Sequence, residues 1–442
     1  MLVSVYGAGR IGLTLVGAWY KAGFDVTGVD INEEHINRLN ALDLGFIQEG
    51  ELRELIARGV KDGKVKFTTD GVSASRRSQV HLMAVPTLLS QESRSFEPGA
   101  LKAASRTISR GLKGGDLVIL ESSVPPGTTS GLVREVLESE SGLLAERDFY
   151  LVYSPERVYI GRALDDLVRK YPKIIGGIGP LSSKVASDVY SKVVERGTVV
   201  VRDTVTAELV KLFEGVYRDV NIALANELAI LCEKLGVNYY EVRDAANTQP
   251  YSHLHTPGAG VGGVCIPFYP YFVLEAAKKR CTDLPLVSLA RSINESMPLR
   301  TVNVFMDALL RTGIKKESAS VAVLGIAFRG DTSDTRNSPG VDVVRLLINS
   351  GVGEVIAHDP YATVEPELQA LGVKMTSDLA SALRGRNAIV ITADHSVYRS
   401  LSLKVLKDLT GSKNVVVFDT KRVLQAGNED GVAYVLLGSG TF

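Results

Sequence analysis

The segment that ends at Asp30 carries the feature that most narrows what this chain can fold into. An apolar run at residues 3–6 reads as a short buried strand, and a second one at residues 25–29 leads to Asp30. Between them a helical stretch follows the pattern G-x-G-x-x-G, formed by Gly7, Gly9 and Gly12. Strand, glycine turn, helix, strand and acid therefore occur in the order of a βαβ dinucleotide-binding unit.

The chemistry of this unit predicts the cofactor. Glycines let the backbone turn tightly at the helix N-terminus, where N–H groups can bind a pyrophosphate. The Asp30 carboxylate can accept hydrogen bonds from ribose hydroxyls and would repel a 2′-phosphate, so we expect NAD rather than NADP. The expected NAD-binding residues of this segment are Gly7, Gly9, Arg10, Ile11, Gly12 and Asp30.

A second informative segment, residues 257–272, reads PGAGVGGVCIPFYPYF and places Cys265 in a glycine-rich turn. Such a turn can fold closely around a ligand and present its N–H groups, because no Cβ stands in the way. The residues alone leave two interpretations open. Cys265 is either a buried small thiol or a nucleophile that holds a substrate.

The order of elements predicts an α/β fold, with two Rossmann-like doubly wound domains joined by a long central helix. In the first part, strand-like runs separated by helical stretches recur at residues 80–85, 117–120, 149–153 and 173–175, as a parallel sheet requires. In the last part, strands are expected at residues 321–324, 354–357, 388–392 and 415–418, with a helix at 339–349.

The central helix is predicted from an amphipathic run at residues 206–235. Its apolar face is expected to comprise Leu209, Leu212, Val216, Val220, Ala223 and Leu224. A helix of this kind commonly bridges domains and pairs between subunits, so we expect at least a dimer.

Composition excludes several classes of partner. The 50 basic and 50 acidic residues give no net charge, so we expect neither a nucleic-acid nor a membrane-surface partner. No run of about 18 apolar residues occurs. The three cysteines form neither a C-x-x-C pair nor a disulfide framework, which argues against structural zinc and is typical of a reducing compartment. We expect a cytoplasmic protein.

Several motifs in order along the chain resemble the UDP-glucose/GDP-mannose dehydrogenase family. Besides GAGRIG with Asp30 and the Cys265 loop, they are AVPT (84–87), ESSVPPGTT (121–129), YSPERVYIGRAL (153–164), AELVKLFEGVYRDVNIALANELA (207–229) and GIAFRGDTSDTRNSP (325–339). Within the family, SPER, RDVNIALANE and GVGG-x-CIP look most like the branch that oxidises UDP-N-acetylhexosamines, notably UDP-N-acetylmannosamine. The resemblance implies an NAD-binding domain at 1–202, a central dimerisation and catalytic-cysteine region at 203–300, and a UDP-binding domain at 301–442.

The resemblance also implies a reaction, the oxidation of a sugar C6 alcohol to a carboxylate with two NAD in succession. The Cys265 thiolate would add to an intermediate aldehyde, and the resulting thioester would be hydrolysed. Lys211 matches the lysine that handles the C6 oxygen, and Glu156 matches the glutamate that positions or deprotonates water. Pro86, Thr87, Ser123 and Arg336 are expected to contact NAD. The substrate would be bound by Arg157, Val158, Lys211, Arg218, Gly262 and Arg329.

This chain departs from the family pattern at four positions. Gly215 stands where the family has an asparagine, and Tyr269 stands where the cysteine loop carries an aspartate. Tyr251 replaces an arginine that is frequent in this branch, and Val264 replaces a histidine. Because a lost oxyanion donor can slow a reaction by about 10²- to 10³-fold, we expect slow or differently tuned activity.

Three alternatives stay open at this point. The substrate could be UDP-N-acetylglucosamine or UDP-glucose, since N-acetyl recognition has no short motif. Gly215 and Tyr269 would also fit a weakened relative that binds nucleotide sugar and NAD without turnover. An unrelated Rossmann dehydrogenase, such as a 2-hydroxy acid enzyme, would leave Cys265 and the SPER motif unexplained.

Overall fold

The computed structural model describes residues 1–90, 94–159, 161–425 and 427–440. The chain separates into two compact units. Unit 1 comprises residues 1–214 and 271–282, and unit 2 comprises residues 215–270 and 283–442. The predicted long helix is present as α9 (Thr204–Leu235), and it contributes residues to both units.

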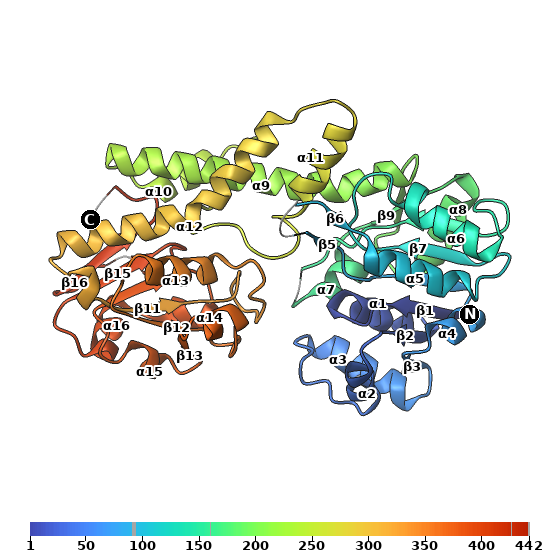
Figure 1. Cartoon of the computed structure of the whole chain (residues 1–442), viewed down its shortest axis with the longest axis horizontal. Coiled ribbons are helices and arrows are strands. Elements are labelled where there is room, and N and C mark those ends of the chain that lie inside the picture. The colour runs from blue at the N-terminus through green and yellow to red at the C-terminus, as the bar shows by residue number, and fades with distance from the viewer. Residues whose placement is uncertain (91–93, 160, 426, 441–442) are drawn as a thin grey trace. The chain divides into compact units, whose positions relative to one another are not determined.

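Unit 1 is built on an eight-stranded sheet with the strand order β10-β9-β8-β7-β4-β1-β2-β3 (Figure 1). The sheet begins in its middle with β1, adds β2 and β3 on one side, and then adds β4 and β7 on the other. The strand order therefore reverses between β1 and β4, where a doubly wound sheet leaves a crevice at the carboxyl ends of its strands. The strands are β1 (Leu2–Tyr6), β2 (Asp25–Val29), β3 (Val65–Thr68), β4 (Val80–Met83), β7 (Leu117–Leu120), β8 (Tyr150–Tyr153), β9 (Lys173–Gly177) and β10 (Thr198–Val200).

One strand runs against the predicted direction. The strand at residues 173–175 was expected in a parallel sheet, but β9 pairs antiparallel with β8, with Val152 opposite Gly177. β10 then pairs parallel with β9. Among its described residues, the segment between β8 and β9 forms the short α7 (Ala163–Asp165) and the single turn η2 (Asp166–Lys170), whereas a parallel return needs a full crossover.

Successive strand residues point to opposite sides of this sheet, and both sides carry apolar side chains. Helices therefore cover both faces. Val3 and Val5 of β1 belong to one core with Trp19, and Val118 and Leu120 of β7 belong to the other. The helices are α1 (Arg10–Lys21), α2 (Glu33–Asn40), α3 (Gly50–Lys61), α4 (Gly71–Arg77), α5 (Gly99–Ser109), α6 (Arg134–Ser141) and α8 (Pro180–Tyr190), and a small hairpin pairs β5 (Leu88–Leu89) with β6 (Phe96–Glu97).

Unit 2 contains a six-stranded sheet, parallel throughout, with the order β13-β12-β11-β14-β15-β16 (Figure 1). The strands are β11 (Ser320–Leu324), β12 (Glu354–His358), β13 (Lys374–Thr376), β14 (Ala388–Ile391), β15 (Val415–Asp419) and β16 (Val432–Leu436). The helices are α10 (Tyr239–Ala246), α12 (Pro285–Arg311), α13 (Pro339–Asn349), α14 (Pro366–Ala370), α15 (Leu379–Leu383) and α16 (Leu403–Thr410), and α11 (Tyr269–Lys279) crosses from unit 2 into unit 1. The predicted α/β fold with two doubly wound sheets and a long helix is confirmed.

The buried face of α9 differs from the predicted one. Leu212 and Ala223 are buried, but Leu224 is 42% exposed. The buried positions of α9 also include Glu208, Asp219 and Asn226, whose polar side chains are bonded inside the protein. Apolar periodicity alone therefore misplaces the face, since polar residues share the interior. In the described part of the chain, no helix combines the length and the apolar character needed to cross a membrane.

Candidate functional site

The glycine turn of unit 1 has the geometry of a dinucleotide site. Gly7 has a φ of +95°, and a Cβ there would lie 2.6 Å from the carbonyl oxygen of Ala84. A Cβ at Gly12 would collide with the carbonyl oxygen of Gly7, whereas one at Gly9 would meet nothing within 4 Å. Thus two glycines are required by close packing of the backbone, and the third leaves the entrance of α1 open.

The helix terminus and the acid complete this arrangement. Gly9 is the N-cap of α1, and among the described side chains none caps that end by a hydrogen bond. Asp30 follows β2, and its carboxylate accepts from the backbone N–H of Ala8 at 2.9 Å and from that of Asn32 at 3.0 Å. An uncapped helix N-terminus beside a carboxylate fits a pyrophosphate and an adjacent ribose. The residues present therefore fit NAD.

The other predicted NAD-binding residues of unit 1 lie at the same edge of the sheet. Pro86 and Thr87 follow β4, and Ser123 follows β7, while β4 pairs directly with both β1 and β7. Arg10 and Ile11 open α1. The fold thus brings these positions to the carboxyl ends of neighbouring strands.

Glu156 follows β8 at this edge, but its side chain points into the protein. The carboxylate is only 7% exposed and pairs with the ammonium of Lys173 on β9. The same ammonium lies 2.6 Å from the Glu121 carboxylate and 3.3 Å from the Pro155 carbonyl oxygen. We call Glu121, Glu156 and Lys173 the buried triad.

Lys211 of α9 contacts the same turn from another direction. Its ammonium donates a hydrogen bond to the backbone carbonyl of Glu156. The neighbouring Arg157 is held within unit 1, because its guanidinium pairs with Glu214 at 3.0 Å and donates to the Pro172 carbonyl at 2.6 Å. Val158 packs against the hydrophobic core. The structure therefore gathers Lys211, Glu156 and Arg157 around one turn of unit 1.

Cys265 lies in unit 2, in a loop (residues 257–268) that its glycines pack against the segment after β11. A Cβ at Gly262 would lie 2.7 Å from the carbonyl oxygen of Asn337. Gly263, with a φ of +85°, donates through its N–H to the Arg336 carbonyl at 2.9 Å and accepts from the Asn337 amide at 3.0 Å. The Cys265 residue is exposed, so the interpretation as a buried thiol is wrong.

The departures at Gly215 and Tyr269 form a matched pair. Tyr269 is 5% exposed, and a Cβ on Gly215 would collide with its ring. The backbone N–H of Tyr269 also donates to the Cys265 carbonyl at 3.0 Å, as does that of Phe268. The aromatic ring thus occupies the volume of a side chain at position 215 and packs the cysteine turn against α9.

The predicted arginines of unit 2 have different surroundings. The Arg336 guanidinium makes two hydrogen bonds to the Asp334 carboxylate, of 2.8 and 2.6 Å. The hydrogen bond to Asp334 is the main cause of a raised Arg336 pKa, with a smaller contribution from the charge of Cys265. Burial lowers the pKa of His255, and the charge of Arg218 lowers it further. Arg329 lies in the loop after β11 beside Gly330, whose N–H donates to Asp394. Tyr251 is 91% exposed.

Sequence reasoning missed the buried triad as a unit. Glu121 stood inside a recognised motif without a role, and Lys173 was only part of a predicted strand. A lysine and a glutamate within otherwise apolar strand segments are a usable signal, because charged residues are almost never fully buried unless paired. Nothing in the sequence, however, says which charges pair.

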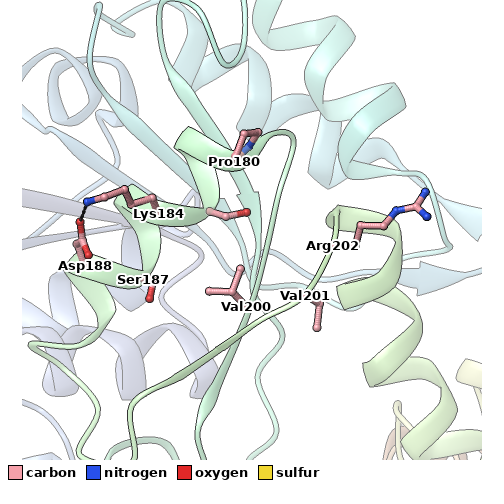
Figure 2. A pocket seen from close by; sticks show the side chains of 8 residues that line it. Pro180, Lys184, Ser187, Asp188, Val200, Val201 and Arg202 are labelled. Atoms are coloured by element: carbon pink, nitrogen blue, oxygen red, sulfur yellow. Dashed lines mark hydrogen bonds and ion pairs between the residues drawn. The ribbon is translucent and has the colours of Figure 1, made fainter.

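A hollow of about 600 Å³ lies elsewhere in unit 1, between α8 and the edge strand β10 (Figure 2). Figure 2 shows the exposed ion pair between Lys184 and Asp188 of α8, together with Val200 of β10 and Arg202 in the segment that follows it. None of its lining residues is among the predicted site residues. The chemistry of the chain is therefore not located by this hollow.

Three models of one family match the chain in order. The models of the UDP-glucose/GDP-mannose dehydrogenase family are its NAD binding domain at residues 1–194, its central domain at 205–296 and its UDP binding domain at 322–426.

Individual relatives match over nearly the whole length. The chain is 38% identical to a UDP-N-acetyl-D-mannosamine dehydrogenase of Pyrococcus horikoshii, covering 100% of this chain and 99% of the relative. It is 33% identical to an NDP-N-acetyl-D-galactosaminuronic acid dehydrogenase of Ralstonia solanacearum, covering 96% of each.

Solved structures of related dehydrogenases also match over nearly the whole chain. The structure of the UDP-D-ManNAc dehydrogenase from Pyrococcus horikoshii has a TM-score of 0.90 at 36% identity and covers 100% of both chains. The UDP-N-acetyl-mannosamine dehydrogenase from Staphylococcus aureus has a TM-score of 0.85 at 33% identity and covers 99% of this chain and 98% of that one.

Proposed function

The chain belongs to the UDP-glucose/GDP-mannose dehydrogenase family, and we propose that its substrate is UDP-N-acetyl-D-mannosamine, oxidised at C6 to the uronate. Its class, an NAD-dependent nucleotide-sugar dehydrogenase, follows from the family and confirms the predicted enzyme and cofactor. The single observation that carries the choice of sugar is the full-length likeness to relatives that are named for UDP-N-acetyl-D-mannosamine.

NAD would be held by the glycine turn of unit 1. We assign its pyrophosphate to the α1 N-terminus at Gly9, Arg10, Ile11 and Gly12, with Gly7 shaping the turn. Asp30 would bind the adenosine ribose, and Pro86, Thr87 and Ser123 would line the nicotinamide end. Arg336 is assigned to the cofactor as well, which would require its bond to Asp334 to be shared. Bound NAD supplies the hydride acceptor.

The chain's own residues handle the proton and the acyl group. We assign Lys211 to the C6 oxygen, where an ammonium can stabilise developing negative charge. The Cys265 thiolate adds to the aldehyde carbon, and oxidation of this thiohemiacetal gives a thioester that water hydrolyses. Support for Cys265 is its exposure on a loop fixed by Gly263 and Asn337.

The role of Glu156 differs from the water activation expected from its motif. Its carboxylate is buried and pairs with the Lys173 ammonium, so it is already engaged inside the protein. We therefore assign Glu156 mainly to positioning, through the carbonyl that binds Lys211. The substrate contacts Arg157, Val158, Arg218, Gly262 and Arg329 belong to the same proposal, as do the domain limits 1–202, 203–300 and 301–442.

A homodimer is part of the proposal. α9 exposes an apolar stripe at spacings of seven and four residues, which keeps its members on one helix face. Its members Tyr217, Leu224, Leu231 and Leu235 are 53%, 42%, 52% and 66% exposed. A second copy is the partner that would cover such a stripe by symmetry.

A cytoplasmic location is supported by the free state of Cys232, Cys265 and Cys281.

The test is NADH formation with a panel of UDP-sugars. We expect UDP-N-acetylmannosamine to give the highest kcat/KM, ahead of UDP-N-acetylglucosamine, UDP-N-acetylgalactosamine and UDP-glucose. Preference for another sugar by tenfold or more would overturn the proposed substrate while leaving the enzyme class intact. Binding of NAD and UDP-sugar without any NADH would instead indicate a relative that no longer turns over.

A further inference from the structure

The buried triad is the strongest arrangement of charged groups that the proposed reaction does not yet use. Three different elements supply it, since Glu121 follows β7, Glu156 follows β8 and Lys173 begins β9. The exposed fractions of the three side chains are 0%, 7% and 4%. Burying three charges is expensive, so they persist only where geometry and pairing compensate.

The surroundings of the triad decide its charge. The Tyr190 hydroxyl of α8 donates to Glu121, and the Lys173 ammonium lies 5.0 Å from the centre of the Tyr190 ring. Burial raises the pKa of Tyr153 of β8, and the negative charges of Glu121 and Glu156 raise it further. Two carboxylates therefore share one ammonium.

The charge of this cluster depends on the protonation of Glu121. Burial, against the attraction of Lys173, raises the pKa of Glu121 to about 8. Burial alone would lower the Lys173 pKa, but the two carboxylates outweigh it and raise it. The neutral form of Glu121 would leave the Lys173 ammonium to the Glu156 carboxylate. Above pH 8, Glu121 competes for the ammonium.

The contacts of Lys173 reach the site through one turn. Its ammonium holds the Glu156 carboxylate and also lies 3.3 Å from the Pro155 carbonyl oxygen. The next carbonyl along the chain, that of Glu156, accepts the hydrogen bond from Lys211. The turn is thus fixed from its buried side by one lysine and offers its carbonyl to the other.

We propose that Lys173 is a positioning residue, which fixes the Glu156 turn and through it the ammonium of Lys211. This inference rests on the proposed function, because it assumes that Lys211 acts on the C6 oxygen. Displacing a catalytic group by about 1 Å can lower a rate by about 10²-fold. Lys173 would therefore control kcat without touching substrate, and Glu121 would set the pH range in which it does so.

The experiment compares Lys173→Met and Lys173→Arg with the control Lys184→Met. Lys184 is also in unit 1, but its side chain is 72% exposed and pairs with Asp188 on its own helix. The readouts are melting temperature, the KM for NAD, and kcat with UDP-N-acetylmannosamine. We expect Lys173→Met to lower kcat by about 10- to 100-fold with little change in the KM for NAD. Lys173→Arg should recover part of the loss, and Lys184→Met should behave like wild type.

A folded Lys173→Met enzyme with wild-type kcat would overturn the proposal. If that variant does not fold, Glu121→Gln keeps the proposal testable, since it removes the competing charge and leaves the pair between Lys173 and Glu156. Wild-type kcat should fall above about pH 8 as Glu121 ionises, and Glu121→Gln should lack this fall. Superimposable pH profiles of kcat would refute the role of the triad. An inactive wild-type enzyme would instead refute the proposed function, so the two failures are distinct.

Discussion

Gly215→Ala should destabilise the protein, against the ordinary effect of this change in a helix. Replacing a glycine inside an exposed helix normally stabilises by about 0.5–1 kcal/mol. Here the added Cβ would collide with the Tyr269 ring and lie 3.2 Å from the Tyr269 Cβ. The ring cannot easily move away from α9, because Tyr269 is only 5% exposed and its backbone N–H donates to the Cys265 carbonyl.

The expected magnitude follows from opposing contributions. Overpacking costs about 1–3 kcal/mol, which outweighs the helical gain and leaves a net loss of about 0.5–2 kcal/mol. For a unit of this size that lowers the melting temperature by about 2–6 °C. Calorimetry of the full chain measures it. Gly131→Ala is the matched control, since a Cβ at Gly131 in η1 (Thr129–Val133) meets nothing within 4 Å.

A double-mutant cycle then isolates the contact. In a Tyr269→Ala background, itself less stable by about 3–5 kcal/mol for the lost aromatic packing, Gly215→Ala should become neutral or stabilising. The reasoning would be refuted if Gly215→Ala raised the melting temperature of the otherwise unchanged protein, or if the effects of the two substitutions were additive.

The remaining predictions concern the nucleophile, the cofactor and a buried acid. Cys265→Ser should abolish uronate formation, measured by mass spectrometry of the product, because a hydroxyl is a far weaker nucleophile than a thiolate. The affinity for the nucleotide sugar, measured by calorimetry, should stay within about threefold of wild type. Near-normal acid production by this variant would refute the covalent route. Asp30→Ala should narrow the preference in kcat/KM for NAD over NADP by removing charge repulsion; equal use of both cofactors by the unmodified enzyme would contradict this role. Burial raises the pKa of Glu208 to about 7, above the value near 4.3 of an unfolded chain, so its contribution to stability is present below about pH 4 and lost as the pH rises through about 7. The urea midpoint of Glu208→Gln should therefore fall less between pH 5 and pH 8 than that of the wild type, and equal falls would show that Glu208 does not titrate in this range.

Strands and helices with simple local patterns could be predicted from the sequence. The strand at residues 117–120 and the helix at 339–349 were placed with their observed ends. The first is an uninterrupted apolar run, and the second begins after Ser338, which caps it, with Pro339 in its first turn. Short edge strands such as β10 and β13 were not predicted, because few of their residues are buried and their pattern is weak.

The motifs located the candidate site residues, but they could not say how each side chain is bound. Glu156 was expected to lie near the reacting centre, whereas its carboxylate lies against Lys173, which belongs to none of the motifs. Gly215 and Tyr269 looked like two separate losses, and the structure makes them one packing contact. Such pairings depend on which strands and helices become neighbours, and local sequence carries little of that information.

The central claim is a two-step oxidation that passes through an acyl group on Cys265, and a single rapid-mixing experiment tests it directly. Enzyme, NAD and UDP-N-acetylmannosamine are mixed, NADH is followed by absorbance, and the quenched protein is weighed intact. We predict a burst of about two NADH per active site, then slower turnover limited by thioester hydrolysis, with a sugar-nucleotide adduct at Cys265. One NADH per sugar with release of an aldehyde, or linear kinetics without an adduct, would contradict the account.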